Sequence, residues 1–508
     1  MSSWTRSLRW SSDSEGFNNA MAILSVPKAA GIGSDAADRR WLGLAVIATA
    51  QLMIALDATV VNIALPSAQA ALGFGDADRQ WIVSAYTLAL GGLLLVGGRV
   101  ADSVRIGRQR ALMIGLMGFA AASALSGAAV NLGMLVAARA LQGVFAAVLA
   151  PTALSTLAVM FTAPHERARA FGIYGAIAAS GGALGLLLGG MLTQYLDWRW
   201  CLYINVPIAV FAALGARALL PDVRPARAES RNAPFDGLGL VLGSGGLVAI
   251  VFGCGQAATL GWNAPLVLAL LGLGVLALVL FVRQEARAKS PLLPLHVVLD
   301  RDRGAAYLSA MLAVAGMFGA FLFLTYVLQV VMRFSPFQAG LAFLPMTISS
   351  FVAGTIVAPR LLPCVSARVL MAPGFVLAAL GMSVLTQLHA GSDYVSGILP
   401  AEVLLGLGVA SIMMPASSLA TSRVEPHVAG IASAALNSAQ QIGASLGTAV
   451  LNTLAASATA AYLIANTSAV HADALVHGYA TAALWAAALL LAGAAIAFLL
   501  PHRRLEPR

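Results

Sequence analysis

Asp57 is the residue whose position most directly suggests chemistry, because it lies inside an apolar segment long enough to cross a bilayer. The segment runs from Trp41 to Ala64, and a lone carboxylate in hydrocarbon costs roughly 2.5–3.5 kcal/mol on insertion scales. Arg139 lies in a later apolar segment. At a rise of 1.5 Å per residue, both fall about 22–24 Å from the same membrane face.

Burial disfavours the charged form of Asp57, whereas a nearby guanidinium favours it. A carboxyl group balanced in this way is suited to bind and release a proton, and we predict that Asp57 and Arg139 together couple protonation to a conformational change. The alternatives are that Asp57 is a fixed hydrogen-bond acceptor and that Arg139 has a purely structural role between helices.

A polar stripe marks the segment 430–456. Its members recur every three or four residues and therefore share one helix face: Asn437, Gln441, Ser445, Thr448 and Asn452. A polar face within lipid must contact protein or water. The candidates for contact with a bound small molecule are Asn62, Gln142, Glu402, Asn437, Gln441 and Ser445. Interhelical hydrogen bonding is the alternative for the stripe, and a position among lipid headgroups for Glu402.

The elements that must position these residues are membrane-spanning helices. The chain of 508 residues is 59% hydrophobic and 10% charged, with a mean hydropathy of +0.85, whereas soluble domains carry about 25% charged residues. We predict an all-α integral membrane protein with about fourteen spans. They are roughly 42–64, 80–100, 111–130, 134–159, 168–193, 200–220, 236–256, 264–282, 305–331, 337–357, 368–388, 397–420, 430–456 and 476–500.

The basic residues orient these spans. Of 30 Lys and Arg residues, only Arg79, Arg199 and Arg333 fall in loops opposite the termini. Cytoplasmic loops carry most of the positive charge, so we expect both termini in the cytoplasm and a location in a bacterial inner (cytoplasmic) membrane. Residues 1–40 are expected to form a disordered cytoplasmic tail, and 501–508 a second cytoplasmic tail.

A faint internal repeat indicates two halves. Gly98 to Asp102 ends the second span and Gly354 to Arg360 ends the tenth, each followed by an arginine-bearing loop. We therefore expect six-span bundles at 41–222 and 304–500, separated by two additional spans at 236–283. Halves of this kind place a substrate site at their interface.

The sequence lacks the residues that several classes of activity require. Neither lysine, Lys28 or Lys289, follows a glycine, so no Walker A loop is encoded. The three cysteines have no metal-ligand spacing, and no arrangement of residues suggests an enzyme. We expect no cofactor and no metal. The basic residues lie beside membrane spans, so anionic lipid rather than nucleic acid is the expected partner.

A series of motifs then resembles one family in order and spacing. They are Leu56-Asp57-Ala-Thr-Val-Val-Asn62-Ile-Ala-Leu-Pro66, Gly97-Gly-Arg-Val-Ala-Asp102, Arg139-Ala-Leu-Gln142-Gly143, Gly185 to Gly190, Trp198-Arg-Trp200 with Asn205-Val-Pro207, and Gly430 to Asn452. Over about residues 42–500 the chain resembles a major facilitator superfamily transporter, of the fourteen-span drug:proton antiporter type. The resemblance implies two six-helix bundles plus two extra helices.

The resemblance also implies roles for two motifs. The loop from Gly98 to Arg110 is similar to the family's cytoplasmic gating motif, in which glycine permits close helix approach and an acid pairs with a basic group. The matching residues are Gly98, Arg99, Asp102, Arg105, Gly107 and Arg108. The spacing between Asp102 and Gly107 is longer than usual, so the roles of the individual arginines stay open.

The second motif is a glycine face formed by Gly181, Gly185, Gly189 and Gly190, where the family's antiporters usually carry a proline at the position of Leu186. We expect close helix packing here and leave open whether the helix is kinked.

From the residues we expect an ion-coupled transporter. The resemblance implies proton-coupled export of small amphipathic or drug-like compounds by alternating access, by a monomer with a possible periplasmic adaptor. The alternatives are a dedicated exporter of one metabolite or antibiotic, a proton-coupled importer and, in a different class, a membrane sensor or membrane-embedded enzyme.

Overall fold

The computed structural model describes residues 34–101, 107–161, 163–220, 236–288, 291–293, 295–362, 364–389, 391–421, 426–466 and 470–498. Most of the expected N-terminal tail and all of 501–508 lie outside these residues. The first helix begins at Ser34, so the last part of the segment expected to be a tail is helical. The described residues are helices and their connections, with no strand among them.

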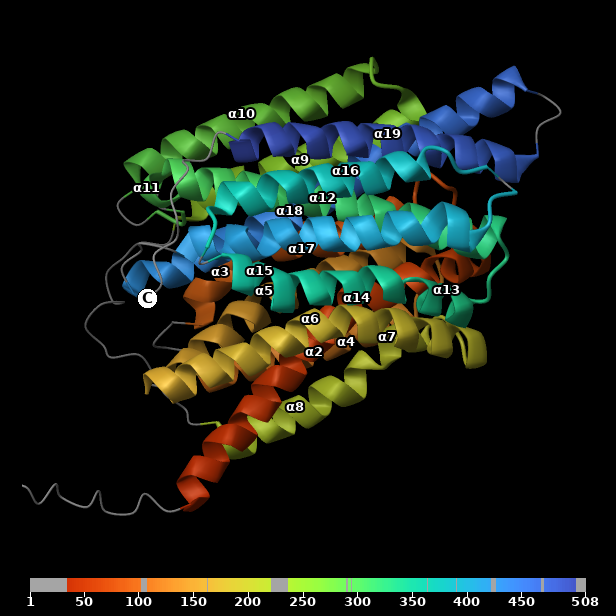
Figure 1. The fold of residues 1–508 in the computed structure, drawn as a ribbon. Helices are drawn as coiled ribbons and strands as arrows, with labels where there is room; N and C mark the ends of the chain where they lie inside the picture. The colour runs from red at the N-terminus through yellow and green to blue at the C-terminus, as the bar shows by residue number, and fades with distance from the viewer. Residues whose placement is uncertain are drawn as a thin grey trace, which may run out of the picture.

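Helices that run back and forth along one axis make up the molecule (Figure 1). The first group comprises α2 (Ser34–Leu72), α3 (Gln80–Ala101), α4 (Arg108–Gly127), α5 (Leu132–Met160), α6 (Pro164–Tyr195), α7 (Trp200–Tyr203) and α8 (Asn205–Leu219). The next pair is α9 (Gly237–Leu260) and α10 (Pro265–Arg287).

The remaining elements are α11 (Leu295–Val298), α12 (Arg301–Tyr326), η1 (Val327–Val331), α13 (Pro336–Ala342), α14 (Leu344–Val352), η2 (Ala353–Val357), α15 (Ala358–Leu361), α16 (Ala367–Leu385), η3 (Tyr394–Ile398), α17 (Leu399–Thr421), α18 (Pro426–Ala465) and α19 (His471–Phe498). We call α2–α8 the first half and α12–α19 the second half. The near end is where α2 begins, and the far end is where α2 ends at Leu72 and α3 starts at Gln80.

Among the described residues, thirteen helices are long and apolar enough to cross a membrane, and Gln80–Leu94 is a shorter apolar helix within α3. These segments correspond to the fourteen predicted spans. Helix α2 is longer than predicted at both ends, and α18 continues to Ala465, beyond the predicted end at residue 456. Four of the nine residues added to α18 are alanine, the best helix former, which favours its continuation.

Helix starts and breaks follow local sequence. Asn131 caps α5 by accepting a hydrogen bond from the Met134 backbone N–H at 2.8 Å. Ser335 and Gln338 form a capping box that begins α13. The break between α13 and α14 precedes Pro345, which has no backbone N–H to continue the helix. These features fix where helices turn at the far end.

Two main apolar cores fill the molecule. One lies within the first half and is built from α2–α6 and α8, chiefly toward the near end. The other is built mainly from α12–α19, yet it includes far-end residues of the first half, from Val60 to Ala68 of α2 and from Trp198 to Leu202. The two halves thus share one core at the far end.

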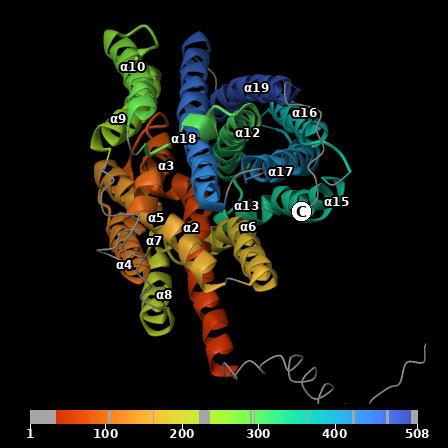
Figure 2. The same ribbon diagram turned by 90° about the vertical axis from the view of Figure 1, so that its left-hand side faces the viewer.

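The additional pair lies beside both halves (Figure 2). Helix α9 packs against α3 of the first half and α18 of the second, and α10 packs mainly on α9. Ser244 of α9 donates a hydrogen bond to the Gly92 carbonyl at 2.9 Å, and Thr453 of α18 donates to the Cys254 carbonyl of α9 at 2.9 Å. The pair therefore covers the junction of α3 with α18.

Candidate functional site

Asp57 and Arg139 form a buried ion pair. Asp57 is 0% exposed and Arg139 is 2% exposed, and Arg139 Nη1 lies 2.6 Å from Asp57 Oδ2. Helix α2 contributes the carboxylate and α5 the guanidinium, so both come from the first half. Their contact agrees with the similar depths expected from the sequence.

The other carboxylate oxygen accepts two amide hydrogen bonds. Gln142 Nε2 donates to Asp57 Oδ1 at 3.1 Å, and Asn205 Nδ2 donates at 2.8 Å. Both amides also donate to the hydroxyl of Ser123. Asp57 thus receives donors from α5 and α8.

Arg139 is held from the opposite side. Its Nε donates to the carbonyl of Ile82 at 3.2 Å, its Nη1 donates to Gln142 Oε1 at 3.0 Å, and its guanidinium lies 4.5 Å from the ring centroid of Tyr86. A buried ion pair with its remaining hydrogen-bonding groups satisfied is stable as a unit, but loss of either partner leaves an uncompensated buried charge.

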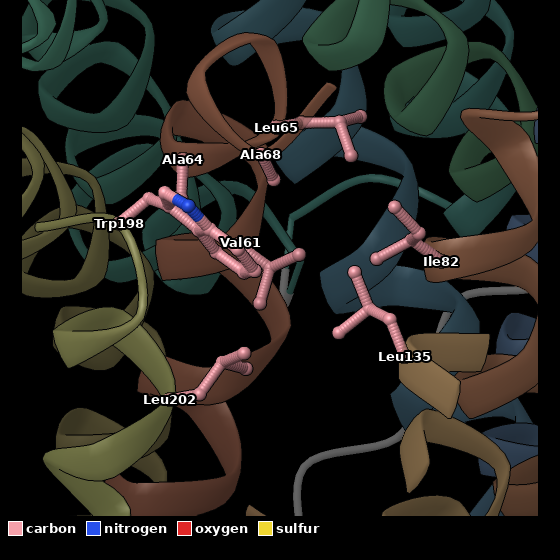
Figure 3. A pocket seen from close by; sticks show the side chains of 8 residues that line it. All are labelled: Val61, Ala64, Leu65, Ala68, Ile82, Leu135, Trp198 and Leu202. Carbon is pink, nitrogen blue, oxygen red and sulfur yellow. The ribbon is translucent and has the colours of Figure 1, made fainter. Parts of the chain in front are cut away.

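A small apolar pocket lies on the far-end side of this ion pair (Figure 3). Val61 is one turn beyond Asp57 and Leu135 is one turn before Arg139, toward the far end in each case. The lining is completed by Ala64, Leu65, Ala68, Ile82, Trp198 and Leu202. Apolar cavities of this kind do not hold water well, and the side chains one turn from Asp57 and Arg139 on this side are apolar.

The glycine face of α6 packs on the helix that carries Asp57. A Cβ atom at Gly181 would lie 2.5 Å from the Ala55 side chain, one at Gly185 would lie 2.9 Å from the Leu56 carbonyl oxygen, and one at Gly189 would lie 2.8 Å from the Val60 carbonyl oxygen. Gly190 instead faces the second half, where a Cβ would lie 2.6 Å from the Pro336 carbonyl oxygen. Close helix packing was predicted for all four glycines. Three of them pack on α2, and Gly190 packs on α13 of the second half.

The gating motif is only partly described. Asp102 and Arg105 lie outside the described residues, as does the side chain of Arg99. Gly107 caps α4 with a φ of 76°, which favours glycine, and Arg108 begins that helix. Close approach was expected at Gly98, but a Cβ there would lie 3.7 Å from Pro151. A Cβ at Gly97 would instead overlap the Ala147 carbonyl, so the close contact of α3 with α5 belongs to Gly97.

Four of the six candidate substrate-lining residues are buried in this structure. Asn62 is 3% exposed, and Gln142, Glu402 and Ser445 are 0% exposed. Gln142 belongs to the Asp57 network, and the Ser445 carbonyl accepts a hydrogen bond from Ser84 of α3 at 3.4 Å. Because they are buried, these four line no open surface here, although Ser445 Oγ and Glu402 Oε1 make no hydrogen bond within the described residues. Asn437 and Gln441 are partly exposed.

Polar contacts join the two halves at the far end. Tyr326 donates to Gln69 Oε1 at 2.5 Å, Gln329 Nε2 donates to the Ile63 carbonyl at 2.9 Å, and the Phe337 backbone N–H donates to Gln194 Oε1 at 3.1 Å. All of these groups lie near the far ends of their helices. The two halves are therefore closed against each other at this end.

Arg79 is the centre of this closure, although the sequence marked it only as a basic residue of a loop. It is 1% exposed, and its Nε donates to Asn452 Oδ1 at 3.2 Å. Its guanidinium lies 4.0 Å from the ring centroid of Tyr326 and 5.5 Å from that of Tyr479. Asn205 was also missed as a site residue. Its signals were an amide in an otherwise apolar segment and its place in the motif Asn205-Val-Pro207.

Comparisons with known proteins agree with this arrangement. A sequence profile of the Major Facilitator Superfamily matches residues 47–448. The chain is 50% identical over 490 residues to a puromycin resistance protein, pur8, of Streptomyces alboniger, covering 96% of each chain. It is 41% identical over 419 residues to the cephamycin export protein CmcT of Amycolatopsis lactamdurans, covering 82% of this chain and 85% of that one. It is 34% identical over 420 residues to the multidrug efflux pump LfrA of Mycolicibacterium smegmatis, covering 82% and 81%.

Solved structures share the fold. The POT family transporter PepTSo aligns with a TM-score of 0.66 at 16% identity, covering 92% of this chain and 99% of that one. A bacterial homologue of the human lysosomal transporter Spinster, in an inward-facing and unoccupied conformation, aligns with a TM-score of 0.64 at 16% identity, covering 91% and 96%. The profile match and the relatives together establish that the chain belongs to the major facilitator superfamily.

Proposed function

We propose that the protein is a proton-coupled secondary transporter that exports small amphipathic, drug-like or antibiotic compounds by alternating access. The observation that carries the proposal is the buried pair of Asp57 and Arg139, since an ionisable pair in the membrane interior is typical of proton relays. Relatives named for antibiotic resistance, export and multidrug efflux support the direction and the class of substrate.

The basic residues favour an orientation in which the near end faces the cytoplasm. The far end then faces outward, and contacts between the halves close it in this structure. Asp57 has three donors, which suits a group that has already released its proton. We infer that protons are taken up from outside in the opposite state and are released inward in this one.

Protonation changes the balance at the ion pair. A proton on Asp57 Oδ2 removes the charge that holds Arg139 Nη1 and turns an acceptor into a donor. Arg139 then has a buried charge without a counterion, which favours rearrangement of α2 against α5. In each cycle the proton moves inward while the substrate leaves outward.

We propose that the protein lies in a bacterial inner (cytoplasmic) membrane with both termini in the cytoplasm. Its near-end arginines then contact anionic lipid. We further propose that it acts as a monomer, with or without an adaptor. Asn437 and Gln441 are the polar candidates for contact with substrate.

One experiment tests the coupling. Everted membrane vesicles energised with a proton gradient should accumulate substrate and release protons, and Asp57→Asn should abolish both. Asn keeps the size and the acceptor oxygen but cannot carry the proton. Proton-coupled accumulation by the variant at the parent rate would exclude this mechanism.

A second candidate is a dedicated exporter of a single antibiotic. The identity of 50% over 96% of both chains to a puromycin resistance protein favours it. A growth-inhibition panel in an efflux-deficient host, with puromycin among many unrelated compounds, separates the two. Protection against one chemical class alone supports the dedicated exporter.

A further inference from the structure

The second half contains a buried carboxyl group that the proton-coupled cycle does not use. Glu402 lies in the first turn of α17 and is 0% exposed. One carboxyl oxygen, Oε2, lies 3.2 Å from the Tyr394 hydroxyl oxygen, and the other makes no hydrogen bond within the described part of the chain. An ionised carboxylate in this position would be poorly compensated.

The Tyr394 hydroxyl fixes the direction of this hydrogen bond. It lies 2.7 Å from the carbonyl oxygen of Ala342 and 3.2 Å from Glu402 Oε2. A hydroxyl has one proton to donate, and a carbonyl can only accept, so the shorter contact takes the Tyr394 proton. The Tyr394 oxygen then accepts, and the donor to it is Glu402 in its protonated form.

Charged groups on neighbouring helices lie away from Glu402. Helix α17 packs against α12, α14, α15, α16, α18, η2 and η3. Among their described residues, α14 and η2 have no titratable side chain and η3 has only Tyr394. Two titratable side chains of the other elements are not at the near end: Tyr326 contacts Arg79 at the far end, and Tyr462 lies on the extension of α18. The other titratable side chains are at the near end: Arg301, Asp302, Arg303, Tyr307, Arg360 and Arg368. Asp393, in the connection before η3, is exposed and accepts from the backbone N–H of Val395 and Ser396.

The Ala342 carbonyl belongs to an element of the far-end closure. Ala342 ends α13, and the last carbonyl groups of a helix lack partners within it. Helix α13 packs on α6 of the first half, where a Cβ at Gly340 would lie 2.6 Å from the Leu186 carbonyl oxygen. Glu402, Tyr394 and Ala342 therefore connect the interior of the second half to the surface that closes on α6.

We propose that Glu402 is a proton-operated latch of the far end, which holds a proton while α13 is closed on α6 and gives it up when α13 moves away. On opening, the O–H bond of Glu402 breaks, the proton passes to water at the far end, and the Tyr394 hydroxyl turns to donate to the carboxylate. On closing, the carboxylate takes a proton from the same side. The latch thus moves no proton across the membrane.

The sign of the pH dependence follows by linkage. Closure takes up one proton, so a lower pH favours the closed far end and a higher pH favours the open one. For a single proton the ratio of closed to open molecules changes by up to about tenfold per pH unit. The inference rests on alternating access, but not on Asp57 as the proton carrier.

Distances between spin labels measure this closure directly. Labels on cysteines introduced at Val130 and Ile464, which are 75% and 80% exposed, report the separation of the halves at the far end. The purified full chain, with Cys201, Cys254 and Cys364 replaced, is measured between pH 5.5 and 8.5. The parent background carries Asp57→Asn, so that its titration does not contribute.

In this background we expect the closed population to grow as the pH falls. Adding Glu402→Gln should keep the population closed and remove the pH dependence, because the amide donates to Tyr394 as the acid does. Adding Tyr394→Phe should lower the closed population at every pH. Ser350→Ala removes a different hydrogen bond between α14 and α17, to the Gly406 carbonyl, and should leave the pH response unchanged.

A pH response that persists in the Glu402→Gln background, or that is absent from the Asp57→Asn parent, overturns the latch. Both outcomes leave the vesicle experiment on export unaffected, because no substrate or proton gradient is present in the distance measurement.

Discussion

At the scale of single residues, the site consists of a carboxylate that accepts from three donors. Arg139, Gln142 and Asn205 each donate a hydrogen bond to Asp57. A hydrogen bond to a charged group contributes about 1.5–3 kcal/mol. Each donor is therefore expected to affect the rate of transport.

Asn205→Ala tests this dependence. Removal of the Asn205 amide leaves Gln142 as the one amide donor to Asp57 Oδ1. We expect the transport rate to fall by about tenfold, since 1.36 kcal/mol is a factor of ten. The measurement is the initial rate of substrate accumulation in vesicles.

The matched control is Asn466→Ala, since that amide lies one residue beyond the end of α18 and donates to the Tyr462 carbonyl of that helix. An unchanged transport rate in Asn205→Ala would show that the amide only fills space beside Asp57.

The contact of Asp57 with Arg139 could be predicted because depth follows from residue counts at a fixed rise. The amides of Gln142 and Asn205 could not be assigned to Asp57 in this way. Their place in the network depends on the rotation and tilt of α5 and α8, which hydropathy does not encode. For Glu402 the sequence suggested contact with substrate or headgroups, and its hydrogen bond with Tyr394 could not be predicted from the sequence.

At the scale of elements, α6 positions α2 through a row of glycines. Backbone atoms of α2 occupy the space that side chains would need at Gly185 and Gly189. Small residues that allow close backbone approach are typical of membrane helix interfaces. The row therefore fixes the depth and rotation of Asp57.

Gly185→Ala should lower thermal stability and transport together. Its Cβ would meet the Thr59 hydroxyl and the Leu56 carbonyl, and overpacking of this kind costs about 1–3 kcal/mol. Gly182→Ala on the same helix is the control, because nothing lies within 4 Å of a Cβ there. It should be neutral or stabilising, since alanine is the better helix former. Equal melting temperatures for the two variants would contradict the proposed packing.

The spans themselves were predictable from apolar length and from arginine placement. The break between α13 and α14 and the extension of α18 were not, because they occur where apolar length no longer decides helix limits. Gly97 rather than Gly98 makes the close contact with α5, which depends on the rotation of α3 by a single residue.

At the scale of the whole molecule, the halves are joined at the far end and Arg79 is the most connected residue there. Its cation–π contacts with Tyr326 and Tyr479 and its bond to Asn452 all cross between halves. Desolvated cation–π contacts contribute about 2 kcal/mol or more. The sequence alone could not indicate which end is closed, because the same apolar pattern serves both states.

Arg79→Gln should open the far end more often. A cysteine introduced at Ser84, which is 0% exposed between α3 and α18, should then react faster with a maleimide in a background without other cysteines. We expect acceleration by about tenfold or more, since 1.36 kcal/mol is a factor of ten.

Arg199→Gln is the matched control, because Arg199 is also at the far end but donates to the Gly127 and Ala129 carbonyls of its own half. If both variants react at the parent rate, Arg79 does not hold the closure.

The position of α9 and α10 has a consequence for compounds dissolved in the bilayer. The pair lies over the junction of α3 with α18, away from the junction of α6 with α13 (Figure 2). The junction of α3 with α18 is therefore covered by two helices, whereas the junction of α6 with α13 is not covered by this pair. An apolar compound that diffuses in the bilayer is thus expected to contact the two junctions unequally.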